Sequence, residues 1–515
     1  MEIKNPILSG FYPDPSACAV GDKFYLVNSS FCYFPGVPIF ESSDLKHWHQ
    51  IGNVLDRASQ LPLHEDGMSR GIFAPTIRYH EGTFYMITTN CSHGGNFVVT
   101  ATDPAGPWSE PHYIAGADGI DPSLFFDDDG KCYYIGTRPN PKGVGWNGDW
   151  YIYVQELDLE NWCLLGDYKL VWNGAMRKAE WPEGPHLYKK DGWYYILHAE
   201  GGTGPSHAVC VARSKDIFGP YENNLLNPVF THRHLGKAYP IRYVGHADLI
   251  CAKDGNWYAV MLASRPCDMC SNMGRETFLA KVTWEDGWPV FNAGVGILED
   301  MVTIPDLTTD AKDTDETVTY GLDRDGIPFS MVRLRNPEEN MVVRENGGYR
   351  MKLLPYTLYE CKPTAYLGIR QTSYYFSAKT TVTFSPKADR EAAGLALLQS
   401  EEASLAVLYG QWDGKTGVAV WKKEFRKEPV RIAFSECTAE KVEISLRQYG
   451  QKADLSYCAG GSVTELVKEI DTRFLSTEAA GGFVGNTVGM YATANGSVSD
   501  NTALFDTITY RVTEA

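Results

Sequence analysis

The sequence predicts an all-β protein in which a five-bladed β-propeller is followed by a β-sandwich. A hairpin pattern recurs five times in the N-terminal part of the chain, and runs of alternating polar and apolar residues fill the C-terminal part. At 515 residues the chain is also too long for one ordinary hydrophobic core, so at least two domains are expected.

Each repeat in the N-terminal part places a short polar or proline-containing motif before an apolar stretch, a turn with glycine and an aromatic strand. The five segments read DPSACAVGDKFYLV, APTIRYHEGTFYMI, DPSLFFDDDGKCYYI, EGPHLYKKDGWYYIL and HADLICAKDGNWYAVM. Their turns contain Gly21, Gly82, Gly130, Gly192 and Gly255. Because glycine tolerates the positive φ of tight hairpin turns, each segment is predicted to form a β-hairpin.

The spacing of these hairpins predicts the blades. They recur at intervals of roughly fifty to sixty residues, which suits a four-stranded propeller blade. Several are followed by a further strand closed by Trp or Gly-Pro, as in SSDLKHW, TDPAGPW and SKDIFGPY. The first strand of each blade lines the central channel, so the residues that open the five motifs should face one axis. These residues are Asp14, Ala74, Asp121, Glu183 and His246.

Asp14 lies between Pro13 and Pro15. Proline fixes φ and disfavours helix at the preceding residue, which restricts where the carboxylate can point. For one such motif alone, the start of a turn is the simpler interpretation. The recurrence of acids at matched blade positions favours a functional interpretation instead.

Three carboxylates, those of Asp14, Asp121 and Glu183, are thus expected at one mouth of the channel. Like charges raise one another's pKa, so such a cluster does not serve stability. Cation binding and acid/base catalysis are the two competing functions. Inverting glycoside hydrolysis requires one carboxylate to activate water and a protonated acid to donate to the leaving oxygen, with the carboxyl groups roughly 6.5–9.5 Å apart. Glu183 has the longer side chain and is the expected acid, with a third carboxylate tuning its pKa.

Three further side chains suit a sugar site. Phe31 and Phe73 are placed to offer an apolar platform to a sugar ring, although each alone is more commonly a core residue. Arg275, in NMGRETFL, could bind sugar hydroxyls and hold an adjacent carboxylate ionised.

The hairpin repeat stops after VGILEDMVTIPDL, and the polar, acidic segment TTDAKDTDETVT has no apolar periodicity. A boundary near residue 315 is expected, with a catalytic propeller over residues 1–314 and an accessory domain over residues 315–515. In the second part, KTTVTFS, ASLAVLYGQW, TGVAVWKK and VEISLRQYG alternate polar and apolar residues, which predicts the antiparallel strands of a β-sandwich.

Charge and composition exclude several function classes. The formal net charge is −17 and no Lys/Arg cluster stands out, which argues against nucleic acid and anionic membranes as partners. No apolar run approaches the roughly 20 residues of a membrane helix. The N-terminus MEIKNPILSGF does not read as a secretory signal, so a cytoplasmic location is expected, with twelve reduced cysteines. The Cys267 and Cys270 pair has no second pair or histidines at zinc-ligand spacing.

The chain resembles glycoside hydrolase family 43, in particular its β-xylosidase and α-L-arabinofuranosidase branch. The resemblance is carried, in order along the chain, by NPILSGFYPDPS, SSFCYFPGVPIFESSDLKHW, IFAPTIRYHEGTFYMI, DPSLFFDDDGK, EGPHLYKKDGWYYILHAEGGT, GHADLI and MGRETFLAKVTWEDGWPVFN. It implies an inverting mechanism with Asp14 as general base, Glu183 as general acid, and Asp121 as the acid that orients Glu183 and adjusts its pKa.

The resemblance also implies the substrate site and the second domain. Phe31, Phe73 and Arg275 would line the terminal sugar subsite, together with Ala74 and Thr203 of the matched motifs. The substrate would be a xylo- or arabino-oligosaccharide, and no cofactor is required. In some relatives the histidine matching His246 helps to hold a hydrated calcium ion on the axis; a histidine hydrogen-bonded in the core is the alternative. The second domain would be a jelly-roll, concanavalin-like module that partly covers the propeller mouth and favours exo-action.

Three departures from the common xylosidase pattern leave the choice between xylose and arabinofuranose open. Phe73 replaces a frequent tryptophan, Thr487 in FVGNTVGMYA stands where an aromatic would close the pocket, and TTNCSHGGNFVV is shorter. An arabinan-directed enzyme and a carbohydrate-binding propeller whose acids hold an ion are the rival functions. For the assembly, a homo-oligomer is an open alternative.

Overall fold

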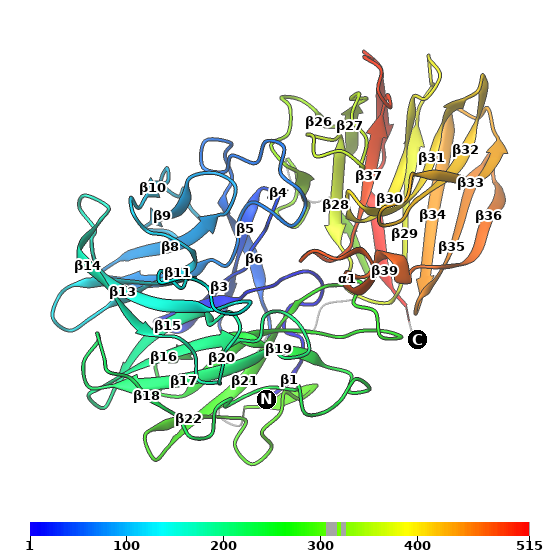
Figure 1. The fold of residues 1–515 in the computed structure, drawn as a ribbon. Helices are drawn as coiled ribbons and strands as arrows, with labels where there is room; N and C mark the ends of the chain where they lie inside the picture. The colour runs from blue at the N-terminus through cyan, green and yellow to red at the C-terminus, as the bar shows by residue number, and fades with distance from the viewer. Residues whose placement is uncertain (305–316, 321–325, 514–515) are drawn as a thin grey trace.

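The computed structural model describes residues 1–304, 317–320 and 326–513. Within these residues, five four-stranded sheets are followed by two larger sheets that pack face to face (Figure 1). The predicted propeller and sandwich are therefore confirmed. The predicted boundary near residue 315 lies outside the described residues.

The five blades each contain four antiparallel strands that pair in chain order. Blade 1 consists of β2 (Ser16–Val20), β3 (Lys23–Val27), β5 (Gly36–Ser42) and β6 (His49–Leu55). Blade 2 consists of β7 (Thr76–His80), β8 (Thr83–Asn90), β9 (Gly95–Ala101) and β10 (His112–Tyr113). Blade 3 consists of β11 (Ile120–Phe126), β12 (Cys132–Pro139), β13 (Trp150–Asp158) and β14 (Cys163–Trp172).

Blade 4 consists of β15 (Glu183–Lys190), β16 (Trp193–Glu200), β17 (Ala208–Ser214) and β18 (Glu222–Asn223). Blade 5 consists of β19 (Arg242–Cys251), β20 (Trp257–Ser264), β21 (Glu276–Glu285) and β22 (Trp288–Phe291). The five first strands, β2, β7, β11, β15 and β19, contact one another in a closed ring around the axis. The predicted hairpin turns are also present, because the five turn glycines all have a positive φ, between 61° and 84°.

The first and last strands of the propeller region pair with each other. The short strand β1 (Glu2–Lys4) pairs with β23 (Met301–Thr303), and the Asn5 side chain bonds the backbone of Leu279 in blade 5. Among the described residues, no helix has the length and hydrophobicity needed to cross a membrane. All twelve cysteines are free thiols in the structure.

The sandwich consists of a nine-stranded and a six-stranded sheet. The first contains β24 (Thr317–Tyr320), β26 (Val342–Glu345), β27 (Gly348–Lys352), β29 (Tyr375–Thr383), β34 (Lys441–Tyr449), β35 (Lys452–Ala459), β36 (Ser462–Asp471), β38 (Thr502–Phe505) and β39 (Ile508–Val512). The second contains β28 (Tyr366–Arg370), β30 (Ala392–Ser400), β31 (Ala403–Trp412), β32 (Lys415–Lys423), β33 (Val430–Glu436) and β37 (Thr487–Thr493). Their facing apolar side chains form one core.

The two domains share structure at their junction. The propeller strand β4 (Tyr33–Phe34) pairs with β25 (Arg333–Leu334) of the C-terminal part, and β4 lies on the side of the propeller nearest the sandwich (Figure 1). Between β36 and β37, a 3₁₀ turn at Arg473–Leu475 and the short helix α1 (Thr477–Ala480) lead back to the propeller. There the Glu478 carboxylate accepts hydrogen bonds from the backbone N–H and the hydroxyl of Ser271. The sandwich is therefore held against the propeller by backbone pairing and by polar contacts.

A buried polar network crosses the propeller axis. The Arg78 guanidinium of blade 2 donates to both carboxylate oxygens of Asp248 in blade 5, at 2.9 and 3.0 Å, and lies 3.0 Å from His186 in blade 4. Ser16 and Tyr188 also donate to Asp248, each at 2.6 Å. Burial alone would raise the pKa of Asp248, but the Arg78 charge holds it well below its usual value. Burial lowers the pKa of His186 to about 3, so this ring is neutral.

Replacing Arg78 by leucine should destabilise the propeller strongly. The Asp248 side chain is fully buried, and Arg78 is its charged partner, because the pKa of the neighbouring His186 is lowered to about 3 and that ring is neutral. Removing one partner of a buried ion pair costs about 3–5 kcal/mol of unfolding free energy. Urea denaturation measures this loss, with Lys23→Met as the control, because the exposed Lys23–Glu41 pair contributes at most about 1 kcal/mol. Equal, small losses in both variants would contradict a structural role for the network.

Candidate active site

One cavity, of about 560 Å³, brings the sequence-predicted site residues together. Its lining includes Asp14, Phe31, Phe73, Ala74, Asp121, Glu183, Thr203, His246 and Arg275. Asp14, Asp121, Phe31, His246 and Arg275 are buried, Phe73 and Glu183 are half-buried, and Thr203 is exposed. The motifs that open the five blades therefore meet at one mouth of the channel.

Three of these residues lie at the same kind of backbone irregularity, which turns their side chains toward the axis. Asp121, Glu183 and His246 each lie at an irregularity in the pairing between the first and second strands of their blade. Asp121 and His246 have φ values of 52° and 50°, and Asp14 has 48°. A bulge re-aims a side chain, and left-handed backbone at residues other than glycine is held in place only by its surroundings. The regular pairing of the inner strands is therefore interrupted at the residues whose side chains enter the site.

Asp14 is fixed through both carboxylate oxygens. The Ser29 hydroxyl donates to one and the Arg275 guanidinium to the other. The preceding carbonyl, that of Pro13, accepts from the Asn28 side chain at 2.9 Å. This orientation leaves Asp14 at the cavity surface with its position set by charge-assisted hydrogen bonds.

Glu183 and Asp121 have perturbed acidities. Burial raises the pKa of Glu183 well above its usual value, and the charges of Asp121 and Asp14 raise it further. Burial also raises the pKa of Asp121, while the charge of His246 and a 3.1 Å hydrogen bond from the Gly184 N–H act in the opposite direction. A carboxyl group kept protonated near neutral pH can act as a proton donor. The raised pKa of Glu183 suits this role, and Asp121 is linked to Glu183 through the adjacent Gly184 N–H.

The arrangement of acids differs from that of a direct cation site. Among the described residues, the one group of three or more His, Cys, Asp or Glu side chains whose ligand atoms lie within 4.8 Å of one another is His198, Glu200 and Cys210. The three cavity carboxylates are spread more widely than this. The geometry therefore suits separate roles for the acids better than shared coordination of one ion.

An aromatic wall faces the acids. The rings of Phe31 and Phe73 lie 5.5 Å apart between centroids, and Phe483 stacks near Phe31 at 6.2 Å. The Arg275 guanidinium lies 5.6 Å from the Phe31 ring and 5.8 Å from the Phe483 ring. Arg275 also donates to the Phe483 carbonyl at 3.3 Å. The cavity therefore offers apolar ring faces beside a fixed cation, which suits a neutral, hydroxyl-rich ligand.

The structure corrects the expectation for Thr487. This residue begins β37, is fully buried, and shares a 2.8 Å hydrogen bond with the Tyr366 hydroxyl outside the cavity lining. The sandwich aromatic at the cavity is Phe483, which is 47% exposed and whose N–H donates to the Ser69 hydroxyl of the propeller at 2.8 Å. A lone aromatic after the Gly481-Gly482 pair is the signal that could have identified it.

Sequence reasoning also missed several other cavity residues. Trp150 begins β13, Trp181 precedes β15, and Gly201, Gly202 and Gly204 follow β16. A Cβ atom on Gly202 would lie 2.8 Å from the Trp181 ring, so this glycine lets the indole pack against the backbone. These residues lie outside the repeated hairpin motifs from which the site was predicted.

The surroundings of His246 do not fit a directly coordinated calcium ion. The ring packs against Gly184, where a Cβ atom would lie 2.8 Å from it. Within the described residues, His246 belongs to no group of three close His, Cys, Asp or Glu donors. Calcium takes six to eight oxygen ligands, often from carboxylates. We therefore assign no chemical step to an ion at this position.

Comparison with known proteins gives two matches along the chain. Residues 3–289 match Glycosyl hydrolases family 43, and residues 323–511 match the Beta xylosidase C-terminal Concanavalin A-like domain. A xylosidase/arabinosidase of Butyrivibrio fibrisolvens is 53% identical over 510 residues, covering 96% of this chain and 97% of the relative. A non-reducing end α-L-arabinofuranosidase of Bacteroides ovatus is 36% identical and covers 99% of this chain and 94% of the relative.

A solved structure gives the same result for the fold. The xylan β-1,4-xylosidase of Bacillus halodurans superposes with a TM-score of 0.91 at 32% identity, covering 99% of this chain and 100% of the other. Both domains and their order are therefore shared with these proteins.

Proposed function

The chain belongs to glycosyl hydrolases family 43, and on this premise we propose that it is an exo-acting, inverting glycoside hydrolase that releases terminal xylose or arabinofuranose from hemicellulose oligosaccharides. The observation that carries the proposal is the meeting of Asp14, Asp121 and Glu183 in one cavity, where the pKa of Glu183 is raised. A binding protein has no need of a protonated acid opposite an oriented carboxylate.

In the proposed reaction, Asp14 removes a proton from a water molecule that attacks the anomeric carbon. Glu183 donates its proton to the leaving glycosidic oxygen in the same step, so the configuration at the anomeric carbon inverts. Burial and then the nearby charge of Asp121 raise the pKa of Glu183, which favours the protonated form that donates. Arg275 fixes Asp14 and binds sugar hydroxyls, and Phe31 and Phe73 contact the ring face.

The sandwich supports exo-action. Phe483 reaches the cavity from the second domain and stacks near Phe31. A long polysaccharide needs an open groove, whereas a cavity closed on one side by another domain accepts a chain end. This favours release of a terminal sugar over an arabinan-directed endo-enzyme.

The choice between the two pentoses is left to experiment. The relatives carry names for both activities, and the cavity lining suits either neutral sugar. A cofactor plays no part in the proposed steps, and a calcium ion held through water beside His246 stays a prediction. A cytoplasmic location and a homo-oligomeric assembly also stay predictions.

The proposed function is tested by hydrolysis of p-nitrophenyl β-D-xylopyranoside and p-nitrophenyl α-L-arabinofuranoside side by side. We expect turnover of at least one of them, and proton NMR of the first sugar released should give the inverted anomer. Hydrolysis of neither substrate, or release of the retained anomer, would reject the proposal. The Asp14→Asn protein serves as the control for contaminating activity.

A further inference from the structure

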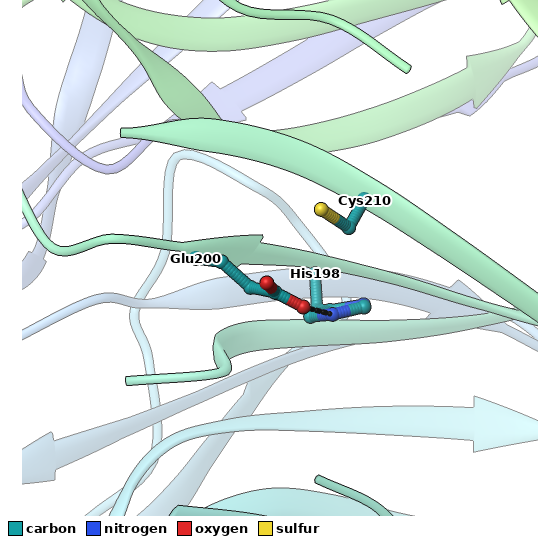
Figure 2. A group of neighbouring side chains, drawn as sticks. All are labelled: His198, Glu200 and Cys210. Atoms are coloured by element: carbon teal, nitrogen blue, oxygen red, sulfur yellow. Dashed lines mark hydrogen bonds and ion pairs between the residues drawn. The ribbon is translucent and has the colours of Figure 1, made fainter. Parts of the chain in front are cut away.

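A second cluster of titratable side chains lies beside the cavity, inside blade 4. His198 and Glu200 are on β16, two residues apart and so on one face, and Cys210 on β17 pairs in register with His198. Figure 2 shows the three side chains converging between these strands. All three are buried, with at most 3% exposure. None lines the cavity, although Glu200 directly precedes Gly201, which does.

The Glu200 carboxylate is the acceptor at the centre of this cluster. It accepts from the Ala175 N–H at 2.5 Å and from the Met176 N–H at 3.3 Å, and its oxygen lies 2.9 Å from the His198 Nε2. Burial would raise the pKa of Glu200, but His198 and the two backbone N–H groups bring it below its usual value. Burial raises the pKa of Cys210 well above its usual value, so its thiol can donate to the carboxylate. Glu200 is therefore a buried anion surrounded by donors.

Two of these donors belong to the segment of residues 173–182, which connects β14 to β15. A Cβ atom at Gly174 would lie 2.3 Å from the Ala179 Cβ and 3.1 Å from a Glu200 oxygen, so the segment folds tightly over the carboxylate. Further along, the Trp146 side chain donates to the Ala179 carbonyl at 2.8 Å. The 173–182 segment is thus pinned near its start by Glu200 and in its middle by Trp146.

The end of the 173–182 segment forms part of the active site. The Trp181 N–H donates to the Gly148 carbonyl, and the Gly201 N–H donates to the Glu180 carbonyl, each at 2.8 Å. Trp181 lines the cavity with a φ of 45°, in the left-handed region that is costly for a bulky residue. Glu183 follows two residues later as the first residue of β15. A strained tryptophan and the proton donor therefore both depend on how this segment is held.

We propose that Glu200, supported by His198 and Cys210, is a positioning residue for the leaving-group side of the site. It fixes the 173–182 segment so that Trp181 forms the wall beside the sugar that departs and Glu183 faces the glycosidic oxygen. The assignment to the leaving-group side rests on the proposed function, because the acid Glu183 must face the departing oxygen and Trp181 lies two residues before Glu183 in the chain. The donors already on Glu200 make the cluster a hydrogen-bonded anchor and not a set of metal ligands.

The variant Glu200→Gln tests the proposal, since it keeps the volume, removes the charge and turns an N–H₂ group toward donors. Charge-assisted hydrogen bonds of this kind are lost at a cost equivalent to about 10- to 100-fold in rate, so kcat/KM on xylobiose should fall by that factor. The loss on a dinitrophenyl glycoside, whose leaving group needs little from the acid, should be several-fold smaller. The alkaline limb of the pH profile should also move, because the surroundings of Glu183 change.

A double-mutant cycle separates positioning from general destabilisation. In a Trp181→Ala background, Glu200→Gln should lose most of its effect on xylobiose, because the wall it positions is gone. Glu222→Gln is the matched control, since this exposed glutamate of blade 4 pairs with Arg213 away from the cavity. Equal losses on both substrates, an unmoved alkaline limb and full additivity with Trp181→Ala would overturn the proposal.

A readout independent of activity completes the test. In Glu200→Gln the amide hydrogens of the 173–182 segment should exchange faster than in the native protein, while β16 and β17 stay protected. If Glu200→Gln does not fold, His198→Leu, which removes one donor, should show the same pattern more weakly. This arm holds even if neither pentoside is hydrolysed, so its failure is distinct from failure of the proposed function. Unchanged exchange, or one zinc ion per chain retained by the native protein and lost in the variant, would overturn the anchor.

Discussion

The variant Asp14→Asn is expected to lose turnover on every glycoside. An amide cannot remove a proton from water, and each substrate needs that nucleophile whatever its leaving group. Loss of a general base reduces kcat/KM by roughly 10²–10⁴-fold. Asparagine keeps the shape of the side chain; its oxygen can accept from Arg275 and its N–H₂ group can donate to the Ser29 hydroxyl, so the pocket should persist. Progress curves on both aryl pentosides and on xylobiose measure the loss.

The control for this variant is Asp22→Asn, in the first hairpin turn of the same blade, where the side chain is 83% exposed. It should keep native activity. A melting curve for each protein shows whether the loss in Asp14→Asn reflects chemistry or folding. Activity in Asp14→Asn within tenfold of the native enzyme would move the base to another carboxylate.

The variant Glu183→Ala is expected to distinguish substrates by their leaving group. A general acid matters most when the departing oxygen is a poor leaving group, as in xylobiose, and least for a dinitrophenyl oxide. The loss of kcat/KM should therefore approach the general-acid contribution of roughly 10²–10⁴-fold on xylobiose and be far smaller on the dinitrophenyl glycoside. Asp14→Asn, by contrast, should lower both alike.

The pH profile supplies a second measurement on the same variant. The pKa of Glu183 is raised by burial and by the charges of Asp121 and Asp14, so Glu183 keeps its proton to a higher pH than an ordinary glutamate does. Its activity should fall on the alkaline side as this proton is lost, and the alkaline limb should flatten in Glu183→Ala. Equal losses on both substrates with an unchanged limb would show that another group donates the proton, with Asp121 the first alternative.

Much of the site could be predicted because its residues occupy equivalent positions in a repeated sequence motif. Asp14, Asp121, Glu183 and His246 occupy matched positions in four of the five similar hairpin motifs, so one inference about blade geometry placed all four of them. The bulges at Asp121, Glu183 and His246 could not be predicted, since they depend on how the inner strands pack around the axis. Proline and glycine in the motifs indicate where the chain turns, but they do not determine the backbone conformation at the bulges.

The parts that sequence reasoning missed come from segments outside the repeat. Trp150 is the first residue of β13 in blade 3, and Trp181 lies in the connection from blade 3 to blade 4, so neither belongs to the repeated hairpin motifs. Phe483 comes from the second domain, and its place depends on how the two domains dock. The sequence predicted Thr487 at the cavity, but Thr487 is buried in β37, and sequence spacing alone does not determine which residue of this part of the chain reaches the propeller.

The polar network of Arg78 and Asp248 has a consequence for the order of events in each cycle. It joins blades 2, 4 and 5 across the axis: Asp248 and His186 are buried, the Arg78 side chain is 16% exposed, and these polar side chains occupy the axis further along the inner strands than the site residues. A freed monosaccharide must leave through the opening by which the chain end arrived. The shortened chain therefore has to leave before the monosaccharide can leave. Each binding event then yields one cleavage. The accumulating monosaccharide competes with the substrate for the same opening.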